Sequence, residues 1–365
     1  MKSQTFFLKQ AIKGAYKIPL FEIARQVPRL SDFIPIRPIR AGINVTNNCN
    51  SRCITCYHWK KQSHNELTLT ELTDILHQMR SLGIADLHLL GGEPLLRNDL
   101  SEIILNARNL KFDRITVTTN GLLLTREKVE QLIENGLTSI NISLNGEEKI
   151  HDFTRGIKGA YARTLDSIRT VVELRNSRFH DLVITVQTIV MDLTLDQIVG
   201  MADMCHQFGI GISFSPLNTT RPWQANISSD LFLIDQEKLS NIIEELHHIK
   251  RNHAALIRES HTSLEYIKGY YADIIRKDIP CYLGYLVIAI GPSGEVFPGG
   301  CLSLPAIGNL RQVPLKQMIH SRAYRESIKR IFLKECTGCA CDYALNLYTH
   351  FPSIIEEIKW RLCLK

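Results

Sequence analysis

The sequence predicts an α/β protein built around a parallel sheet, and three observations carry this prediction. Between residues 41 and 216, six short apolar runs alternate with five amphipathic stretches, which is the pattern of repeated strand–helix–strand units. The chain has 365 residues, enough for one large domain and one small domain. Hydrophobic residues make up 44% of the chain and charged residues 22%, which is ordinary for a globular protein with a sizeable core.

Each element follows from its local pattern. The predicted strands are the apolar runs 41–46, 84–90, 113–119, 137–144, 181–190 and 209–215. The predicted helices are the amphipathic stretches 69–82, 98–110, 125–135, 161–177 and 194–208. Thr68 with Glu71, and Thr194 with Gln197, have the spacing of capping boxes that start two of these helices. Right-handed crossovers would arrange the strands as an open doubly wound sheet or a partial barrel, and both place chemistry at the carboxyl ends of the strands.

Segments outside this pattern are assigned by composition. We predict an N-terminal helical extension over 1–40, a helical bridge over 218–280 with helices at 235–257 and 263–277, and a C-terminal helix over 346–365. Residues 5–27 mix apolar and lysine side chains, a composition that also suits a helix lying at a membrane surface. Because Pro19 interrupts this stretch, a helix packed on the outside of the main domain is the preferred interpretation.

Charge and apolar runs bound the partners and the location. The net charge of +6 comes without a dense Lys/Arg tract, which argues against a nucleic-acid partner. The longest apolar run, 282–290, is shorter than the roughly 20 residues of a spanning helix, and the first residues lack a secretory pattern. We therefore expect a cytoplasmic protein without a transmembrane segment, whose ten cysteines serve metal or redox chemistry rather than disulfides.

Three cysteines follow the first predicted strand directly. Cys49, Cys53 and Cys56 have the spacing C-x3-C-x2-C. Three thiolates on one loop can hold three irons of a [4Fe–4S] cube and leave the fourth iron open to a substrate or cofactor. A zinc site or unpaired thiols are the alternatives, but zinc sites usually come as two C-x2-C pairs. The triple therefore favours an open iron–sulfur cluster.

The second predicted strand ends in Gly91-Gly92-Glu93-Pro94. Two glycines let a ligand approach the backbone, and exposed carbonyls there can accept hydrogen bonds from an ammonium group. Alone, this motif suits a plain strand-to-helix turn better. Paired with the cysteine triple one β/α unit earlier, it resembles the radical S-adenosylmethionine (radical SAM) superfamily. The resemblance implies that residues 41–217 form a partial (β/α)6 barrel of the TIM type, with a small cysteine-rich domain after it.

The resemblance also implies roles for individual residues. Cys49, Cys53 and Cys56 would be the cluster ligands, with S-adenosylmethionine (SAM) bound at the open iron. The methionine ammonium of SAM would contact Gly91, Gly92 and Glu93. The turn Thr119-Asn120-Gly121 resembles the family's TNG turn near SAM. Ser143 and Asn145 lie in a segment that resembles the SLDG segment near the ribose, with asparagine in place of the usual aspartate. Arg155 ends a segment similar to HDxxRG, and its guanidinium would pair with the methionine carboxylate. Thr55 stands where the family often has an aromatic residue.

A second group of cysteines lies in the last third of the chain: Cys281, Cys301, Cys336, Cys339 and Cys341. The Gly-Pro-Ser-Gly sequence at 291–294 predicts a hairpin turn before Cys301. The group resembles the SPASM or twitch extension of radical SAM enzymes, here over 281–345, and a zinc ribbon is the alternative. A full SPASM region has seven cysteines for two clusters, so five imply one auxiliary [4Fe–4S] cluster. Its best ligands are Cys281, Cys301, Cys336 and Cys339, with Cys341 as the rival for the fourth place.

The resemblance predicts an iron–sulfur enzyme that reductively cleaves SAM to a 5′-deoxyadenosyl radical and abstracts hydrogen from a substrate. The preferred substrate is a peptide or protein, which would make the chain a maturase. The alternatives are oxidation or rearrangement of a small molecule such as an amino sugar, and electron transfer without catalysis. A flavodoxin- or ferredoxin-type protein is the expected reductant. No residue for the final acid–base step follows from the sequence.

Overall fold

A computed structural model describes residues 18–60, 65–218, 228–272, 281–300 and 304–333 of the chain. Its centre is a curved eight-stranded sheet in the order β6-β5-β4-β3-β2-β1-β7-β8. The strands are β1 (Arg40–Asn44), β2 (Asp86–Leu90), β3 (Arg114–Thr119), β4 (Ser139–Ser143), β5 (Val183–Val190), β6 (Gly211–Pro216), β7 (Val287–Ile290) and β8 (Val296–Pro298). Neighbouring strands from β6 to β7 are parallel, and only β8 is antiparallel to its neighbour within the described residues.

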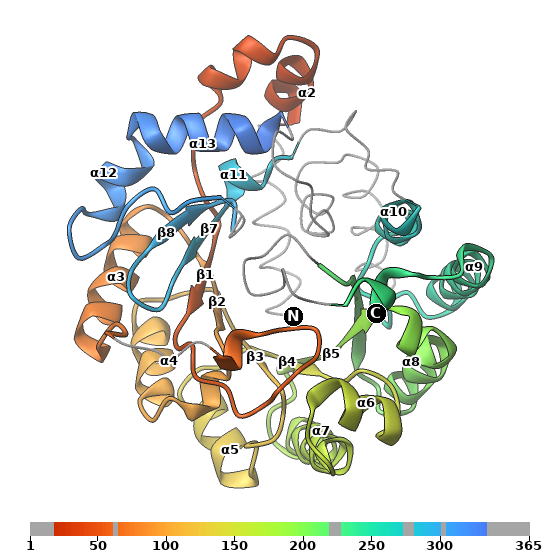
Figure 1. The fold of residues 1–365 in the computed structure, drawn as a ribbon. Helices are drawn as coiled ribbons and strands as arrows, with labels where there is room; N and C mark the ends of the chain where they lie inside the picture. Colours follow the sequence, from red (N-terminus) through yellow and green to blue (C-terminus); the bar gives the residue numbers. More distant parts are fainter. Residues whose placement is uncertain (1–17, 61–64, 219–227, 273–280, 301–303, 334–365) are drawn as a thin grey trace.

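Helices follow the strands and cover the outer side of the arc that β1 to β6 form (Figure 1). These helices are α3 (Leu69–Ser81), α4 (Leu100–Asn109), α5 (Arg126–Glu134), α6 (Glu148–Arg155), α7 (Ala160–Ser177) and α8 (Ile198–Gln207). The predicted α/β class and the partial (β/α)6 barrel are confirmed. The short helix α6, between β4 and α7, was not among the predicted elements.

The two predicted capping boxes had different outcomes. Thr68 caps α3 as predicted: its side chain accepts from the backbone N–H of Glu71, and the Glu71 carboxylate accepts from the backbone N–H of Thr68. The box at Thr194 was wrong. A turn of 3₁₀ helix (Asp192–Gln197) comes first, and α8 begins only at Ile198. Thr194 caps that 3₁₀ turn through the backbone N–H of Met191, so it is not available to start α8.

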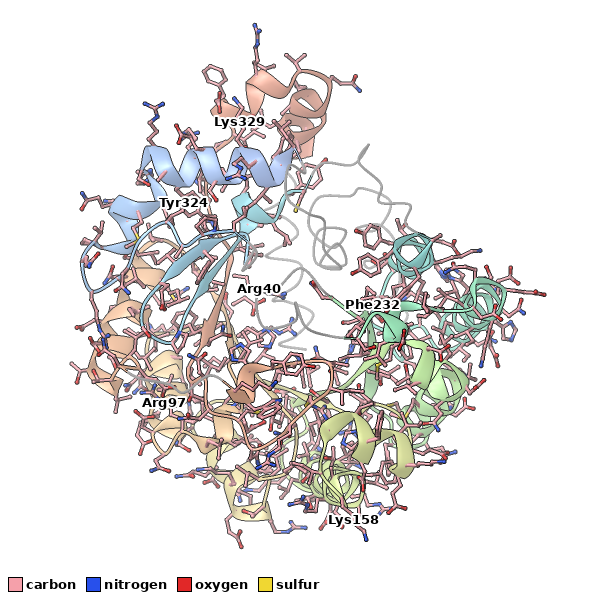
Figure 2. The ribbon with its side chains drawn as sticks, viewed as in Figure 1. Arg40, Arg97, Lys158, Phe232, Tyr324 and Lys329 are labelled. Atoms are coloured by element: carbon pink, nitrogen blue, oxygen red, sulfur yellow. The ribbon has the colours of Figure 1, made fainter. Side chains whose placement is uncertain are left out.

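The two faces of the sheet differ in character because side chains alternate along each strand. On the outer face, Ile43, Leu89, Val117 and Ile142 are fully buried under the helices. The inner face is half-buried and mostly polar: its positions include Arg40, Asn44, His88, Thr118, Ser143 and Gln187. Figure 2 labels Arg40 on this inner side of β1. The sheet therefore supplies an apolar core on one side and a hydrogen-bonding surface on the other.

Residues 281–333 extend the same sheet. β7 pairs with β1 at its open edge, and the predicted turn at 291–294 joins β7 to β8 in an antiparallel hairpin. The helices α11 (Leu283–Leu286), α12 (Leu315–Ile319) and α13 (Arg322–Phe332) follow or flank this hairpin. The Arg311 side chain forms an ion pair with Glu71 at 2.6 Å and thereby ties this region to α3. The predicted C-terminal helix 346–365 lies outside the described residues.

The remaining described helices flank the barrel. α2 (Ile18–Gln26) and a 3₁₀ helix, η1 (Pro28–Phe33), lie beside α13, while α9 (Gln236–Asn252) and α10 (His261–Tyr271) follow β6. Phe21 of α2 is buried against Tyr282, with ring centroids 4.4 Å apart. This part of the extension thus packs on the main domain, as preferred from the sequence. In the described residues, no helix has both the length and the apolar character needed to cross a bilayer.

Candidate functional site

The cysteine triple lies on the loop after β1, at the carboxyl edge of the sheet. Cys53 is buried, Cys49 and Cys56 are partly exposed, and none of the three is in a disulfide. The backbone N–H of Cys56 donates to the carbonyl of Cys53 at 3.3 Å, which closes a tight turn between them. The pKa of Cys49 is raised to about 12, mainly by burial and in smaller part by the charges of Cys53, Glu93 and Cys56. Three thiols on one short loop fit the ligand set of a cluster, and binding iron would displace their protons.

The Gly91-Gly92 turn packs against the backbone at the start of this loop. The backbone N–H of Gly92 donates to the Thr46 carbonyl at 2.8 Å, and that of Glu93 donates to the Asn48 carbonyl at 2.7 Å. A Cβ on Gly92 would lie 2.2 Å from the Asn48 carbonyl oxygen, so no larger residue fits there. The glycines are therefore required by the approach of the cysteine loop itself. Their predicted contact with SAM stays a prediction.

The Glu93 carboxylate joins two of the predicted motifs. It accepts hydrogen bonds from the Thr119 hydroxyl at 2.7 Å, and from the backbone N–H groups of Asn120 at 2.8 Å and Leu95 at 3.1 Å. Burial is the main influence on its pKa and raises it, while these hydrogen bonds and the charge of Arg155 act in the opposite direction. Glu93 is 1% exposed, so its carboxylate connects the turns after β2 and β3 in the interior of the protein.

Asn120 continues this network to the cysteine loop. Its side-chain amide donates to the Asn50 side chain at 2.7 Å and to the Ser51 hydroxyl at 3.0 Å. Asn50 and Ser51 lie between Cys49 and Cys53, and sequence reasoning gave them no role. The C-x3-C spacing itself was the available signal, because residues between ligands are near the ligands.

Arg155, at the end of α6, reaches the cysteine loop from another side. Its guanidinium donates to the Cys53 sulfur at 3.5 Å and to the Ser143 carbonyl at 2.9 Å. The Arg155 carbonyl also accepts from the backbone N–H of Arg52 at 2.9 Å. Arg155 therefore contacts the cysteine loop directly through its side chain and its backbone. Its predicted pairing with the methionine carboxylate of SAM stays a prediction.

Asn145 has structural partners. Its side-chain oxygen accepts from the backbone N–H of Ile189 at 3.1 Å, and its own N–H donates to Nδ1 of His151 at 3.0 Å. These bonds connect the end of β4 to β5 and to α6, and Asn145 is 2% exposed. Its predicted ribose contact, like that of Ser143, stays a prediction.

The structure thus brings most of the predicted site residues into one network at the carboxyl ends of β1 to β4. Cys281 lies apart from it: it is buried next to α11, and its backbone N–H donates to the Phe332 carbonyl at 3.2 Å. Cys301, Cys336, Cys339 and Cys341 lie outside the described residues. Within the described ranges, no three His, Cys, Asp or Glu residues are grouped for a single metal ion. A cube needs wider spacing of its thiolates, because each binds a different iron.

The inner face of the sheet holds polar groups below this network. Nε2 of His88 and the Thr118 hydroxyl are 2.7 Å apart, and the Asn141 amide donates to the same hydroxyl at 3.2 Å. Burial is the main cause that lowers the pKa of His88 to about 3, so the imidazole is neutral at pH 7. Deeper in the barrel, Arg40 and Asp86 form an ion pair at 2.8 Å. Sequence reasoning missed these groups, although the polar positions alternate with apolar ones in each strand.

Glu259, just before α10, is a further buried carboxylate beside the inner face. Its Oε1 accepts from the Ser213 hydroxyl at 2.6 Å, and its Oε2 has no hydrogen-bond partner among the described atoms. Burial raises the pKa of Glu259 to about 7, while the Ser213 hydrogen bond and the charge of Lys250 lower it. The sheet register places Ser213 opposite Gln187 and Gln187 opposite Ser143, so Glu259 is level with the Arg155 contact.

The raised pKa makes stability depend on pH. Above the ordinary value of 4.5, the unfolded chain releases this proton while the folded chain retains it up to about 7. The contribution of Glu259 to the free energy of unfolding is therefore fully present below pH 4.5. It is lost as pH rises from 4.5 to about 7. We expect Glu259→Gln to gain about 2 to 3 kcal/mol over wild type between about pH 5 and about pH 8. Urea unfolding at both pH values checks this, and a constant difference between the two proteins contradicts it.

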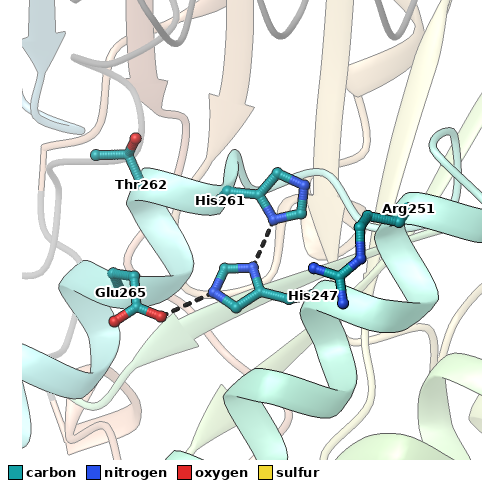
Figure 3. Close-up of a pocket in the computed structure, with 5 residues that line it drawn as sticks. All are labelled: His247, Arg251, His261, Thr262 and Glu265. Atoms are coloured by element: carbon teal, nitrogen blue, oxygen red, sulfur yellow. Dashed lines mark hydrogen bonds and ion pairs between the residues drawn. The ribbon is translucent and has the colours of Figure 1, made fainter.

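A separate polar cluster lies on α9 and α10, away from the cysteine loop in the fold (Figure 3). His247 contacts His261 through their Nδ1 atoms at 2.5 Å and Glu265 at 2.8 Å through its Nε2. Arg251 and Thr262 complete the lining of this shallow pocket. The contacts tie the two helices together.

Comparison with known proteins defines the class. Residues 43–205, from β1 into α8, match the family model of the radical SAM superfamily. This segment, which contains the cysteine loop, the GGEP turn and Arg155, is similar to the radical SAM domain. Members of the superfamily are iron–sulfur enzymes that use SAM.

Curated relatives and solved structures extend the comparison. The GTP 3′,8-cyclase of Clostridium perfringens is 29% identical over 211 residues, which are 54% of this chain and 62% of that protein. The sporulation killing factor maturation protein SkfB of Bacillus subtilis is 27% identical over 270 residues, 73% of this chain and 62% of SkfB. The chain thus spans less than two thirds of both relatives. Streptococcus suis SuiB, solved with its precursor peptide SuiA, has a TM-score of 0.66 at 17% identity, over 84% of this chain and 70% of SuiB. At this identity, the likeness shows a shared fold.

Proposed function

We propose that the chain is a radical SAM enzyme that modifies a peptide or protein, with Cys49, Cys53 and Cys56 as the cluster ligands. The observation that carries the proposal is the network that holds the loop of these cysteines, in which Asn120 joins Glu93 to Asn50 and Arg155 contacts the Cys53 sulfur. When bound, the cluster and SAM supply the electron and the radical that removes a hydrogen atom from the substrate. The protein's own residues hold the loop, orient SAM and exclude water.

Two of these residues act through the loop. Arg155 holds the Cys53 sulfur and the Ser143 carbonyl together, and its guanidinium would also pair with the methionine carboxylate of SAM. Glu93 and Asn120 fix the loop between Cys49 and Cys53, so the three thiols keep one spacing when iron is absent. Fixed spacing is what lets a loop take up a cube without a large ordering cost.

The inner face of the sheet favours a peptide over a nucleotide. A triphosphate carries several negative charges and is bound by arginine, lysine or helix N-termini. In the described part of the chain, the inward positions in the upper halves of the strands are instead Asn44, Leu90, Thr118, Ser143, Gln187, Ile189 and Ser215. Five of these seven side chains are neutral hydrogen-bonding groups, and groups of this kind suit the amides of a peptide backbone. The names of SkfB as a maturation protein and of SuiB bound to a precursor peptide support the same choice.

An auxiliary cluster is part of the proposal. Cys281 is the described member of the second cysteine group, and it is buried and not in a disulfide. With Cys301, Cys336 and Cys339, or Cys341 in the fourth place, it would hold a second [4Fe–4S] cluster, and a flavodoxin- or ferredoxin-type protein would supply electrons.

The substrate class can be tested by tracing hydrogen. The anaerobically reconstituted protein is incubated with SAM, reductant and an extract of host cells grown in heavy water. We expect deuterium to appear in 5′-deoxyadenosine, and protease treatment of the extract to remove this transfer. Transfer that survives protease treatment and follows the small-molecule fraction would overturn the peptide assignment.

A further inference from the structure

The first described helix has two apolar faces, and only one of them is covered. Phe21 and Ala24 of α2 are buried, and the Phe21 ring lies 4.4 Å from that of Tyr282 and 5.5 Å from that of Tyr285. One face of α2 is therefore held by the core of the main domain. This attachment fixes how α2 is turned about its axis, and with it the direction of its second apolar face.

The adjacent face carries a row of exposed apolar side chains that continues from α2 into η1. The exposed fractions are Leu20 39%, Ile23 50%, Val27 48%, Leu30 38% and Phe33 80%. Spacings of three and four along α2, and of three along η1, keep these side chains on one side of their helices. We call these five residues the α2–η1 stripe. Single exposed apolar residues are ordinary, but a connected row of five marks an interaction surface.

The stripe belongs to a segment of the sequence that is rich in basic residues. Residues 1–40 contain eight Lys or Arg and two Asp or Glu, a net charge of +6. The remaining residues contain 35 of each sign, so the whole net charge of the protein lies in this extension. The side chains of Arg325 and Lys329 on α13 add to it, because both reach Asp32 of η1, Lys329 at 3.4 Å. Figure 2 labels Lys329 on α13 below α2.

Apolar side chains flanked by cations fit one kind of partner best. A nucleic acid would pair with the cations, but its phosphates would leave Phe33 and Ile23 in contact with charge. An anionic bilayer satisfies both features, because its headgroups attract the cations while the stripe enters the acyl boundary. We propose that the α2–η1 stripe docks the enzyme on an anionic lipid surface. This role does not depend on the substrate of the enzyme.

The test is co-sedimentation of the full-length, reconstituted protein with vesicles. Wild type is expected to sediment with vesicles of phosphatidylcholine and phosphatidylglycerol, much less with phosphatidylcholine alone, and less as salt is raised. The double variant Ile23→Ser, Phe33→Ser should bind the anionic vesicles at least about tenfold more weakly. Leu233→Ser is the matched control, since Leu233 is 72% exposed but lies beyond β6. It should bind as wild type does.

Three results overturn the proposal. The first is that wild type does not sediment with anionic vesicles, and the second is that the double variant binds them as wild type does. The third is that labelled duplex DNA displaces the vesicles from the wild-type protein. Because Ile23 and Phe33 are half-exposed or more, the double variant should keep the circular dichroism spectrum of wild type. If the double variant loses that spectrum, the single variant Phe33→Ser is tested in its place. It too should bind the anionic vesicles more weakly than wild type does.

Discussion

Replacing Cys53 with alanine is expected to reduce SAM cleavage by more than about 100-fold, since changes in outer-shell partners alone cost 10- to 100-fold. Cys53 is the buried member of the triple, and Arg155 donates to its sulfur. Loss of this thiol leaves two ligands on the loop and a guanidinium without its anionic partner. The measurement is 5′-deoxyadenosine formed per protein under anaerobic, reducing conditions.

Cys205→Ala is the matched control for this experiment. Cys205 is also a buried free thiol, but it lies in α8 within the apolar core, where burial raises its pKa to about 12. The two variants should differ in iron content and in SAM cleavage. Cys205→Ala should retain both. Full activity in Cys53→Ala, or equal loss in both variants, would contradict the assignment of the triple.

Glu93→Ala should be the most destabilising single change at the site. It leaves three donors without their acceptor, from Thr119, Asn120 and Leu95, in a place that is 1% exposed. Removing one partner of a buried, charge-assisted network costs about 3 to 5 kcal/mol. We expect a loss of this size in urea unfolding, together with lower iron content, because the cysteine loop loses its connection to the turn after β3.

Glu244→Ala provides the comparison for Glu93. Glu244 lies on the exposed face of α9, where loss of a carboxylate should change the free energy of unfolding by less than about 0.5 kcal/mol. If Glu93→Ala is as stable as Glu244→Ala and binds iron normally, the fastening role of Glu93 is wrong.

Most of the barrel could be predicted because its signals are local. The strand and helix ranges follow from hydrophobic periodicity, and Thr68 with Glu71 states where α3 begins. The box at Thr194 failed because a threonine three residues before a glutamine also suits a 3₁₀ turn, and the choice depended on contacts with β5. Likewise α6 was missed, since its eight residues are mostly polar and its position is set by the cysteine loop.

The site shows the same division between local and distant information. Motif spacing indicated which residues gather at the carboxyl edge of the sheet. It could not show that Gly92 is needed for backbone packing against Asn48. Nor could it show that the Glu93 carboxylate accepts hydrogen bonds from groups of the protein itself. Glu259 has no sequence signal, because its chemistry comes from burial next to Ser213 on a strand 46 residues earlier.

The central claim is that the cysteine triple leaves one iron of a cluster open to SAM. Electron paramagnetic resonance of the reduced, reconstituted protein tests it most directly, with and without SAM. The account predicts a [4Fe–4S] signal whose g values change when SAM is added, and no such change in Cys53→Ala. A signal that is identical with and without SAM in the wild-type protein would contradict it.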